Sequence, residues 1–236
     1  MISLNDLRKF KAEGRKFSCL TCYDASMAKA MELAEIDTIL IGDSLGMAIQ
    51  GRDSTLPVTV EDMAYHTAAV RRGNQHALIM TDLPFMSYAT LNDALQSSKV
   101  VMQAGAQMVK VEGGAWLAET VQVLTRNGIP VCVHLGLTPQ SVHVFGGYKL
   151  QARTREAADQ LIADCQAVVD AGAAVLLLEC VPAQLGKEIS ELFPHVPVIG
   201  IGAGVDTDGQ VLVVQDMLGL TFGRVAKFCL LYTSDA

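Results

Sequence analysis

The chain has 236 residues, of which 50% are hydrophobic, and its formal net charge is −7. An acidic chain whose longest basic run is the pair Arg71-Arg72 is not expected to bind nucleic acid or an anionic membrane surface. The longest apolar stretch, residues 171–178, falls short of the roughly 18 residues that a membrane helix needs, and the N-terminus is charged where a signal peptide would be apolar. We therefore expect a cytoplasmic protein.

Short apolar runs alternate with amphipathic stretches from one end of the chain to the other. A helix is expected first, at residues 3–13, and apolar runs then predict strands at residues 18–22, 38–41, 77–81, 108–111, 131–133, 174–178 and 198–201. Amphipathic periodicity predicts helices between them, at residues 60–72, 91–104, 115–127, 156–171 and 183–192. For an eighth strand we expect residues 218–221, where the apolar signal is weak.

The order of these elements predicts an α/β fold with a parallel sheet. The apolar runs are almost continuously hydrophobic, as strands covered by helices on both faces should be. Two αβ units repeat, because Gly105 and Gly172 each precede a strand that ends on a carboxylate seven residues later. Such a sheet is either closed into a barrel or open and doubly wound, and the length is close to the roughly 250 residues of one barrel domain.

Two cysteines, Cys19 and Cys22, have the spacing of a redox or zinc motif. Both fall within a predicted strand, where positions three apart point to opposite faces. The two thiols are therefore not expected to converge on a metal or to form a disulfide, and we interpret them as buried cysteines that act as small hydrophobic residues.

Polar and charged side chains recur where the predicted strands end. They are Asp43, Ser44, Asp82, Lys110, Glu112, His134 and Glu179. In a parallel barrel these strand ends share the catalytic face, so residues far apart in the sequence would converge there. One such acid is most often a helix cap, but four acids at four strand ends repel one another unless a cation compensates their charge.

Three of these acids, Asp43, Asp82 and Glu112, form a predicted magnesium site. Carboxylate oxygens without cysteine ligands suit Mg²⁺, which keeps coordination positions open for substrate. A 2-oxo acid fills two such positions through its carboxylate and keto oxygens, and the cation then stabilises the enolate that forms when the neighbouring carbon loses a proton. The alternative reading of each acid is a cap or a loop hydrogen bond.

The remaining polar residues suggest a base and substrate contacts. Glu179 is outside the metal trio and is the candidate base, and the alternative is a structural acid that pairs with a lysine. Lys110 faces the same side as Glu112, and a lysine inside a barrel needs an anion such as a substrate carboxylate; a Schiff base is the competing use, which nearby acids disfavour by keeping the amine protonated. Ser44 either donates to substrate or belongs to a turn, and His134 either contacts substrate or packs against a loop.

Several longer strings resemble the ketopantoate hydroxymethyltransferase family. They are residues 42–47 (GDSLGM), 51–59 (GRDSTLPVT), 82–85 (DLPF), 109–114 (VKVEGG), 134–140 (HLGLTPQ), 145–148 (FGGY), 178–182 (LECVP) and 199–204 (IGIGAG). The resemblance extends from about residue 3 to residue 228, and strings of this length are far more specific than an isolated glycine motif.

The resemblance implies transfer of a hydroxymethyl group from 5,10-methylenetetrahydrofolate to 3-methyl-2-oxobutanoate, which gives 2-dehydropantoate on the route to pantothenate. By the same resemblance, Asp43, Asp82 and Glu112 correspond to the magnesium site. Asp43, Ser44, Asp82 and Lys110 correspond to substrate contacts, and Glu179 corresponds to the proton acceptor. Members of the family assemble as homo-oligomers, often as decamers.

The resemblance ends at residue 228. Family members continue with the closing helix of the barrel, whereas residues 229–236 match no family segment. We therefore expect a single (β/α)8 TIM barrel over residues 1–228, with an N-terminal capping helix and without its C-terminal closing helix. The tail at residues 229–236 is expected to pack poorly and to leave apolar surface uncovered.

Two other functions remain compatible with the polar residues at the strand ends. A Mg²⁺-dependent 2-oxo acid lyase of the isocitrate lyase type uses the same enolate chemistry, but such enzymes carry a reactive cysteine in a Lys-Lys-Cys-Gly-His-like loop that this sequence lacks. A non-catalytic barrel that binds a metal and a ligand is the other, and the presence of Glu179 and Lys110 argues against it.

Overall fold

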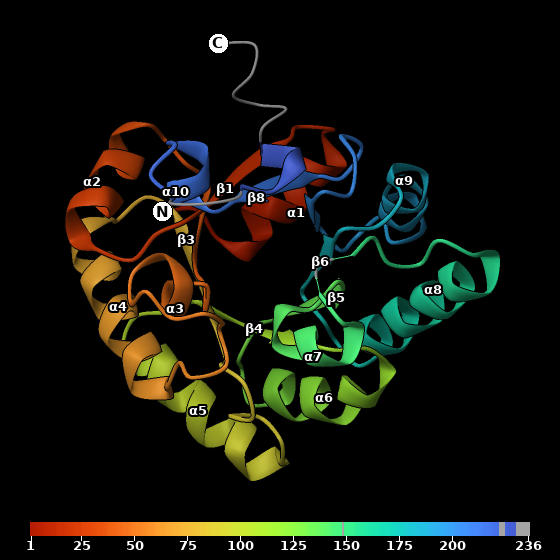
Figure 1. Cartoon of the computed structure of the whole chain (residues 1–236), viewed down its shortest axis with the longest axis horizontal. Helices are drawn as coiled ribbons and strands as arrows, with labels where there is room; N and C mark the ends of the chain where they lie inside the picture. The colour runs from red at the N-terminus through yellow and green to blue at the C-terminus, as the bar shows by residue number, and fades with distance from the viewer. Residues whose placement is uncertain (148, 222–224, 230–236) are drawn as a thin grey trace.

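Eight parallel strands close into a barrel in the computed structural model, which describes residues 1–147, 149–221 and 225–229. Each strand pairs with the next along the chain, and the last pairs with the first (Figure 1). The strands are β1 (Phe17–Thr21), β2 (Thr38–Ile41), β3 (Leu78–Asp82), β4 (Met108–Glu112), β5 (Val131–Gly136), β6 (Val175–Glu179), β7 (Val198–Ile201) and β8 (Gly209–Leu212). The predicted (β/α)8 TIM barrel is thus confirmed.

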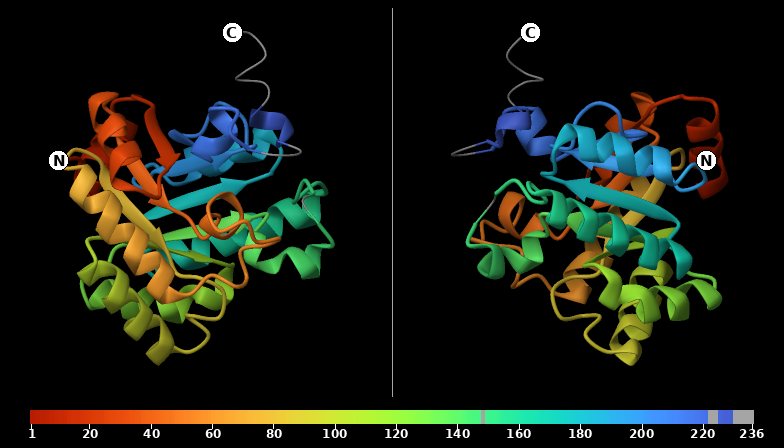
Figure 2. Two further views of the ribbon diagram at one scale, coloured as in Figure 1. Left: turned by 60° about the vertical axis from the view of Figure 1, so that its left-hand side comes forward. Right: turned by 90° about the vertical axis from the view of Figure 1, so that its right-hand side faces the viewer.

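Helices surround this barrel and connect its strands (Figures 1 and 2). They are α1 (Leu4–Ala12), α2 (Ala25–Leu33), α3 (Leu45–Ala48), α4 (Val60–Gly73), α5 (Leu91–Gln103), η1 (Ala115–Leu117), α6 (Ala118–Arg126), η2 (Pro139–Ser141), α7 (Val142–Phe145), α8 (Arg155–Asp170), α9 (Ala183–Leu192) and α10 (Val214–Met217). Within the described ranges, no helix combines the length and the apolar character that crossing a membrane requires.

Local sequence signals explain where several helices begin and end. Ser3 caps α1 and Thr59 caps α4, and in each case an aspartate three residues later completes a capping box. Gly105 follows α5 with a φ of 118°, which favours glycine, and a Cβ there would lie 2.7 Å from the Arg71 side chain. These boundaries agree with the predicted helices.

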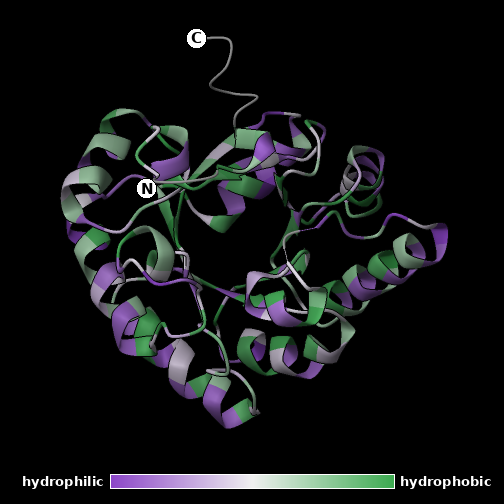
Figure 3. Ribbon diagram, in the orientation of Figure 1, coloured by the Kyte–Doolittle hydropathy of each residue, from purple (hydrophilic) through white to green (hydrophobic). Residues whose placement is uncertain are grey.

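The apolar side chains form two layers that follow the alternation of each strand. An outer layer fills the space between strands and helices, and an inner layer fills the barrel. Cys19 belongs to the inner layer and Cys22 to the outer one, and both are free thiols. The prediction that these two cysteines face opposite sides is confirmed. In Figure 3 the strands are mostly hydrophobic, whereas the surrounding helices alternate between hydrophilic and hydrophobic residues.

Helix α1 packs against the inner layer through Leu7 and Phe10. It is held there by Lys11, whose Nζ lies 2.7 Å from Asp208 Oδ2 and also donates to the carbonyl oxygens of Ser190 and Val196, each at 2.9 Å. Asp208 directly precedes β8, so this buried ion pair ties the first helix of the chain to the last strand of the barrel.

The eighth strand is Gly209–Leu212, so its predicted position at residues 218–221 is wrong. Two features hide the strand from a search for apolar runs. Gly209 has no side chain because the ring of Phe17 fills that space, and a Cβ at Gly209 would lie 2.4 Å from the ring. Gln210 is polar. Leu218 and Leu220 are instead 49% and 56% exposed, so residues 218–221 do not form a strand of the buried sheet.

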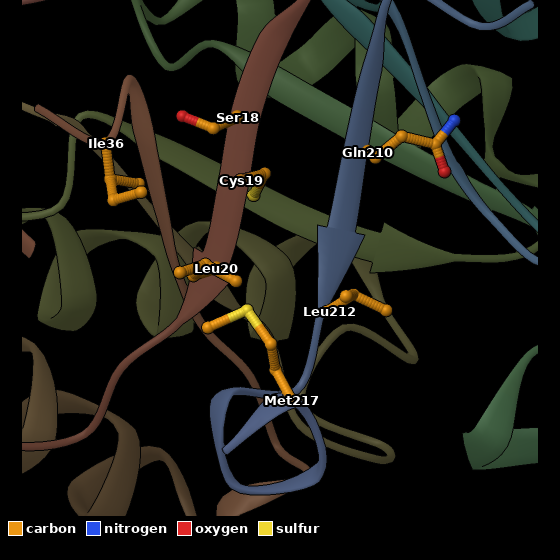
Figure 4. A pocket seen from close by; sticks show the side chains of 7 residues that line it. All are labelled: Ser18, Cys19, Leu20, Ile36, Gln210, Leu212 and Met217. Atoms are coloured by element: carbon orange, nitrogen blue, oxygen red, sulfur yellow. The ribbon is translucent and has the colours of Figure 1, made fainter. Parts of the chain in front are cut away.

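Beyond β8, the described part of the chain contains the four-residue helix α10 and helical residues at 227–229. A cavity of about 220 Å³ with a mainly apolar lining lies at this seam of the barrel (Figure 4). It is lined by Ser18, Cys19, Leu20, Ile36, Gln210, Leu212 and Met217. In the predicted tail, Cys229 is buried, and residues 230–236 lie outside the described residues. The poor packing of the tail therefore stays a prediction.

Candidate active site

Charged side chains gather inside the barrel at the carboxyl ends of its strands. Lys110 and Glu112 of β4 point to the same side because they are two residues apart. The strand register places Asp82 of β3 beside Lys110, and His134 of β5 beside Glu112. The exposed fractions are 3% for Asp43, 2% for Asp82, 3% for Lys110, 4% for Glu112 and 3% for His134. Groups from four strands thus converge in one buried cluster.

Lys110 lies at the centre of this cluster. Its Nζ is 2.9 Å from Asp82 Oδ1, 3.4 Å from Glu112 Oε1 and 3.3 Å from His134 Nδ1. Burial alone would lower the pKa of Lys110, but the negative charges of Asp82, Glu112 and Asp43 outweigh burial and raise its pKa well above the usual value. The amine is therefore protonated, which suits the binding of an anion and opposes the formation of a Schiff base.

The cluster shifts the pKa values of its carboxylates in opposite directions. Burial, together with the charges of Asp82 and Glu112, raises the pKa of Asp43 well above its usual value. Burial also raises the pKa of Asp82, although Lys110 opposes this. For Glu112, burial is outweighed by Lys110 and His134, so its pKa falls to about 2. Negative charge is therefore least well compensated at Asp43 and Asp82.

His134 connects this cluster to Glu179. Its Nδ1 lies 3.2 Å from Glu112 Oε1, and its Nε2 lies 3.3 Å from Glu179 Oε2, a separation that suits an ion pair although it lacks the geometry of a hydrogen bond. Burial and Lys110 would lower the pKa of His134, but Glu112 and Glu179 raise it to about 9. The Glu179 side chain is 14% exposed and ends β6 at the edge of the cluster.

Ser44 lies at the end of β2, beside the same cluster. Its Oγ is 2.8 Å from the hydroxyl of Tyr23, and either oxygen can donate. Gly42 leaves room for this arrangement, because a Cβ there would lie 2.6 Å from Ser44 Oγ and 3.7 Å from Asp82 Oδ2. All seven residues that the sequence singled out therefore lie at the carboxyl end of the barrel.

The sequence analysis missed two residues that hold this cluster together. Gln140 donates from its main-chain nitrogen to Glu112 Oε2 at 2.9 Å and from its side chain to Asp43 Oδ2 at 2.8 Å. Tyr88 donates to Gln140 Oε1 at 2.6 Å. The only signal for Gln140 was its place in the family-like string at residues 134–140, and Tyr88 carried no signal.

The acidic residues provide ligands that suit a hard cation, but they do not surround a complete metal-binding site. Among the described residues, no three His, Cys, Asp or Glu side chains are placed to hold a metal ion together. Mg²⁺ commonly binds through only one or two carboxylates and keeps several waters, so it does not need such a cage. Asp82 Oδ1 is buried with Lys110 Nζ at 2.9 Å, and Asp82 Oδ2 accepts from the main-chain nitrogen of Asp43 at 3.0 Å. The two neighbouring aspartates supply the carboxylate oxygens that Mg²⁺ prefers. Asp43 and Asp82 thus fit this metal.

Comparison with known families gives a match over the whole chain. The sequence profile of the family described as ketopantoate hydroxymethyltransferase matches residues 1–236. Proteins named 3-methyl-2-oxobutanoate hydroxymethyltransferase are also similar. The one from Acinetobacter baumannii (strain AYE) is 92% identical over 228 residues, which are 97% of this chain and 85% of the relative. The one from Psychrobacter sp. (strain PRwf-1) is 65% identical over 97% of this chain and 84% of the relative.

Solved structures with similar folds have much lower sequence identity. A putative phosphonomutase from Burkholderia cenocepacia superposes with a TM-score of 0.68 at 15% identity, over 92% of this chain and 95% of that one. A 2,3-dimethylmalate lyase, a member of the PEP mutase/isocitrate lyase superfamily, superposes with a TM-score of 0.65 at 14% identity, over 93% of this chain and 83% of that one. These likenesses concern the fold alone.

Proposed function

The chain belongs to the ketopantoate hydroxymethyltransferase family and is a hydroxymethyl transferase, and on this basis we propose that it transfers the one-carbon unit of 5,10-methylenetetrahydrofolate to 3-methyl-2-oxobutanoate with the help of Mg²⁺. The product of this transfer is 2-dehydropantoate, on the route to pantothenate. The observation that carries the proposal is the buried cluster of Asp43, Asp82 and Glu112 around a protonated Lys110, with Glu179 at its edge.

The substrate is bound through its carboxylate by Lys110 and Ser44. A protonated lysine inside a low-dielectric site attracts an anion strongly, and the acids around it prevent it from acting as a nucleophile. The Ser44 hydroxyl, oriented by Tyr23, is available as a donor to the same substrate. His134 contacts the substrate from β5.

Asp43 and Asp82 would hold the magnesium ion, with Glu112 as the third carboxylate of the site. Burial, and after it the negative charges of Asp82 and Glu112, raise the pKa of Asp43, and a divalent cation would favour its ionised form. When bound, Mg²⁺ supplies a Lewis acid that stabilises the negative charge developing on the keto oxygen. The protein contributes a buried, rigid pair of acidic ligands at the mouth of the barrel.

Glu179 takes the proton from C3 of the oxo acid, and C3 then forms a bond with the one-carbon unit of the folate. The two bonds from this carbon to the folate nitrogens break and are replaced by the bond to C3 and a bond to the hydroxyl of a water molecule. Tetrahydrofolate leaves with a proton on each freed nitrogen, one from C3 and one from the water. The neighbouring His134, whose pKa is raised to about 9, carries a positive charge at neutral pH, and its Nε2 lies 3.3 Å from Glu179 Oε2, where it orients that carboxylate. General-base groups of this kind contribute about 10²- to 10⁴-fold to a rate.

One assay tests the proposed reaction against its alternatives. Purified protein is given 3-methyl-2-oxobutanoate and 5,10-methylenetetrahydrofolate, with Mg²⁺ or with EDTA, and 2-dehydropantoate is quantified. We expect product only with the folate and the metal. Cleavage of a 2-oxo acid without the folate would instead indicate a lyase, and the absence of any turnover would favour a ligand-binding barrel.

We also propose that the enzyme works in the cytoplasm and that it forms a homo-oligomer. Sedimentation analysis measures the oligomeric state.

A further inference from the structure

Gln140 is buried, with 7% of its surface exposed, and contacts two of the three carboxylates of the proposed metal site. Its side-chain nitrogen donates to Asp43 Oδ2 at 2.8 Å, and its main-chain nitrogen donates to Glu112 Oε2 at 2.9 Å. We propose that Gln140 is a positioning residue for the magnesium site, which it reaches from the loop after β5. This inference rests on the proposed function, because it concerns how that site is held.

The orientation of the Gln140 amide is determined by its surroundings. Its NH₂ group faces two acceptors, Asp43 Oδ2 and the carbonyl oxygen of Leu83 at 3.0 Å. Its oxygen accepts from the hydroxyl of Tyr88 at 2.6 Å. The reversed amide would place its oxygen against a carboxylate and a carbonyl, and it would leave the Tyr88 hydroxyl facing NH₂. Asp43 Oδ2 and the Leu83 carbonyl oxygen, which can only accept, therefore fix the direction in which Gln140 donates, and the Tyr88 hydroxyl supports it from the other end of the amide.

This arrangement gives Asp43 and Glu112 fixed positions without adding charge. Gln140 uses one oxygen of Asp43, Oδ2, so the other oxygen stays available to a cation. Glu112 is held from both sides, because Lys110 and His134 contact Oε1 while Gln140 contacts Oε2. A lysine in place of Gln140 would compete with the cation, whereas a neutral donor orients the carboxylate and leaves its charge for the metal.

The test measures binding of Mg²⁺ alone by isothermal titration calorimetry, together with the melting temperature of each variant. For Gln140→Ala we expect the Kd for Mg²⁺ to rise about 10- to 100-fold, as is typical when a partner of a metal ligand is removed. For Tyr88→Phe, which keeps the ring and loses the hydroxyl, we expect a smaller rise of about fivefold, because Gln140 loses one hydrogen-bond partner and the main chain of Glu112 loses its contact with the same hydroxyl.

A matched control is Gln107→Ala. Gln107 is also a partly buried glutamine that bonds the main chain, since it accepts from Ile79 N at 3.1 Å, but it precedes β4 at the opposite end of the barrel. We expect this variant to lower the melting temperature without changing the Kd for Mg²⁺. A Gln107→Ala variant that weakens Mg²⁺ binding as much as Gln140→Ala would assign the effect to general destabilisation and overturn the proposal.

The outcomes separate this inference from the proposed function. If the unmodified protein binds Mg²⁺ and both Gln140→Ala and Tyr88→Phe bind it equally well, the role of Gln140 is refuted while the metal site stands. If the unmodified protein does not bind Mg²⁺, the metal site and the role of Gln140 fall together. Should Gln140→Ala not fold, Gln140→Met decides the question, because it keeps the size of the side chain and loses only the amide that donates to Asp43. An unchanged Kd for Mg²⁺ in that variant would then count against the proposal.

Discussion

At the scale of single residues, the buried charges of the site decide which substitutions are informative. Burial raises the pKa values of Asp43 and Asp82, and the negative charge of Glu112 adds to this at both residues. We predict that Asp43→Ala or Asp82→Ala abolishes turnover by weakening Mg²⁺ binding, since each variant removes a proposed ligand. The check combines calorimetric Mg²⁺ titration with the product assay. Full activity of the unmodified enzyme after EDTA treatment, with no added metal, would refute the metal requirement itself.

Glu179 allows a second test at this scale, because its proposed role is confined to one proton. We predict that Glu179→Gln binds Mg²⁺ and 3-methyl-2-oxobutanoate with nearly unchanged affinity but slows exchange of the C3 proton with deuterated water by about 10³-fold. Exchange is followed by NMR without the folate, so the measurement isolates proton removal from transfer. Exchange at the rate of the unmodified enzyme would assign the base to another residue.

At the scale of elements, the N-terminal helix depends on one buried ion pair. The Lys11 and Asp208 side chains are 7% and 13% exposed, and Lys11 also bonds two carbonyl groups. We predict that Lys11→Met lowers the free energy of unfolding by about 2 kcal/mol, because the partly buried Asp208 loses its cationic partner while it keeps the hydrogen bond from the Val198 main-chain nitrogen. Urea unfolding measures this loss. Lys9→Met is the control, since Lys9 is 67% exposed in its ion pair and is expected to change stability little.

At the scale of the whole molecule, the seam between β1 and β8 holds an apolar cavity of about 220 Å³. Uncovered apolar surface binds hydrophobic dyes and promotes association. We predict that the folded protein enhances the fluorescence of anilinonaphthalene sulfonate and that Leu20→Gln, in the cavity lining, reduces this signal. Leu33→Gln is the matched control, because Leu33 is an isolated leucine on α2 with 76% exposure. Equal signals from both variants would place the dye elsewhere.

The pattern of residues along the chain was enough to predict most of this architecture. Hydrophobic runs and capping residues are local signals, so a parallel α/β sheet, seven of its strands and its long helices followed from them. Those signals left an open sheet as an alternative, and the closed barrel was expected from the length of the chain and the family resemblance. The convergence of Asp43, Asp82, Lys110 and Glu112 also followed, because parallel strands place their carboxyl ends on one face regardless of their separation in the sequence. The family-like strings then identified the hydroxymethyltransferase family, on which the proposed reaction rests.

Only the tertiary structure identified the last strand and the partners of the site. β8 is short and contains Gly209, and the ring of Phe17 from β1 occupies the space that a side chain at Gly209 would need. Glycine is therefore required at this position of β8 by a residue almost two hundred positions away in the sequence. Gln140 and Asp43 are 97 residues apart, and their hydrogen bond exists because the barrel brings two loops together. The spacing of hydrophobic residues predicts which face of a helix or strand is buried. A specific contact between two side chains depends in addition on where the fold places both of them.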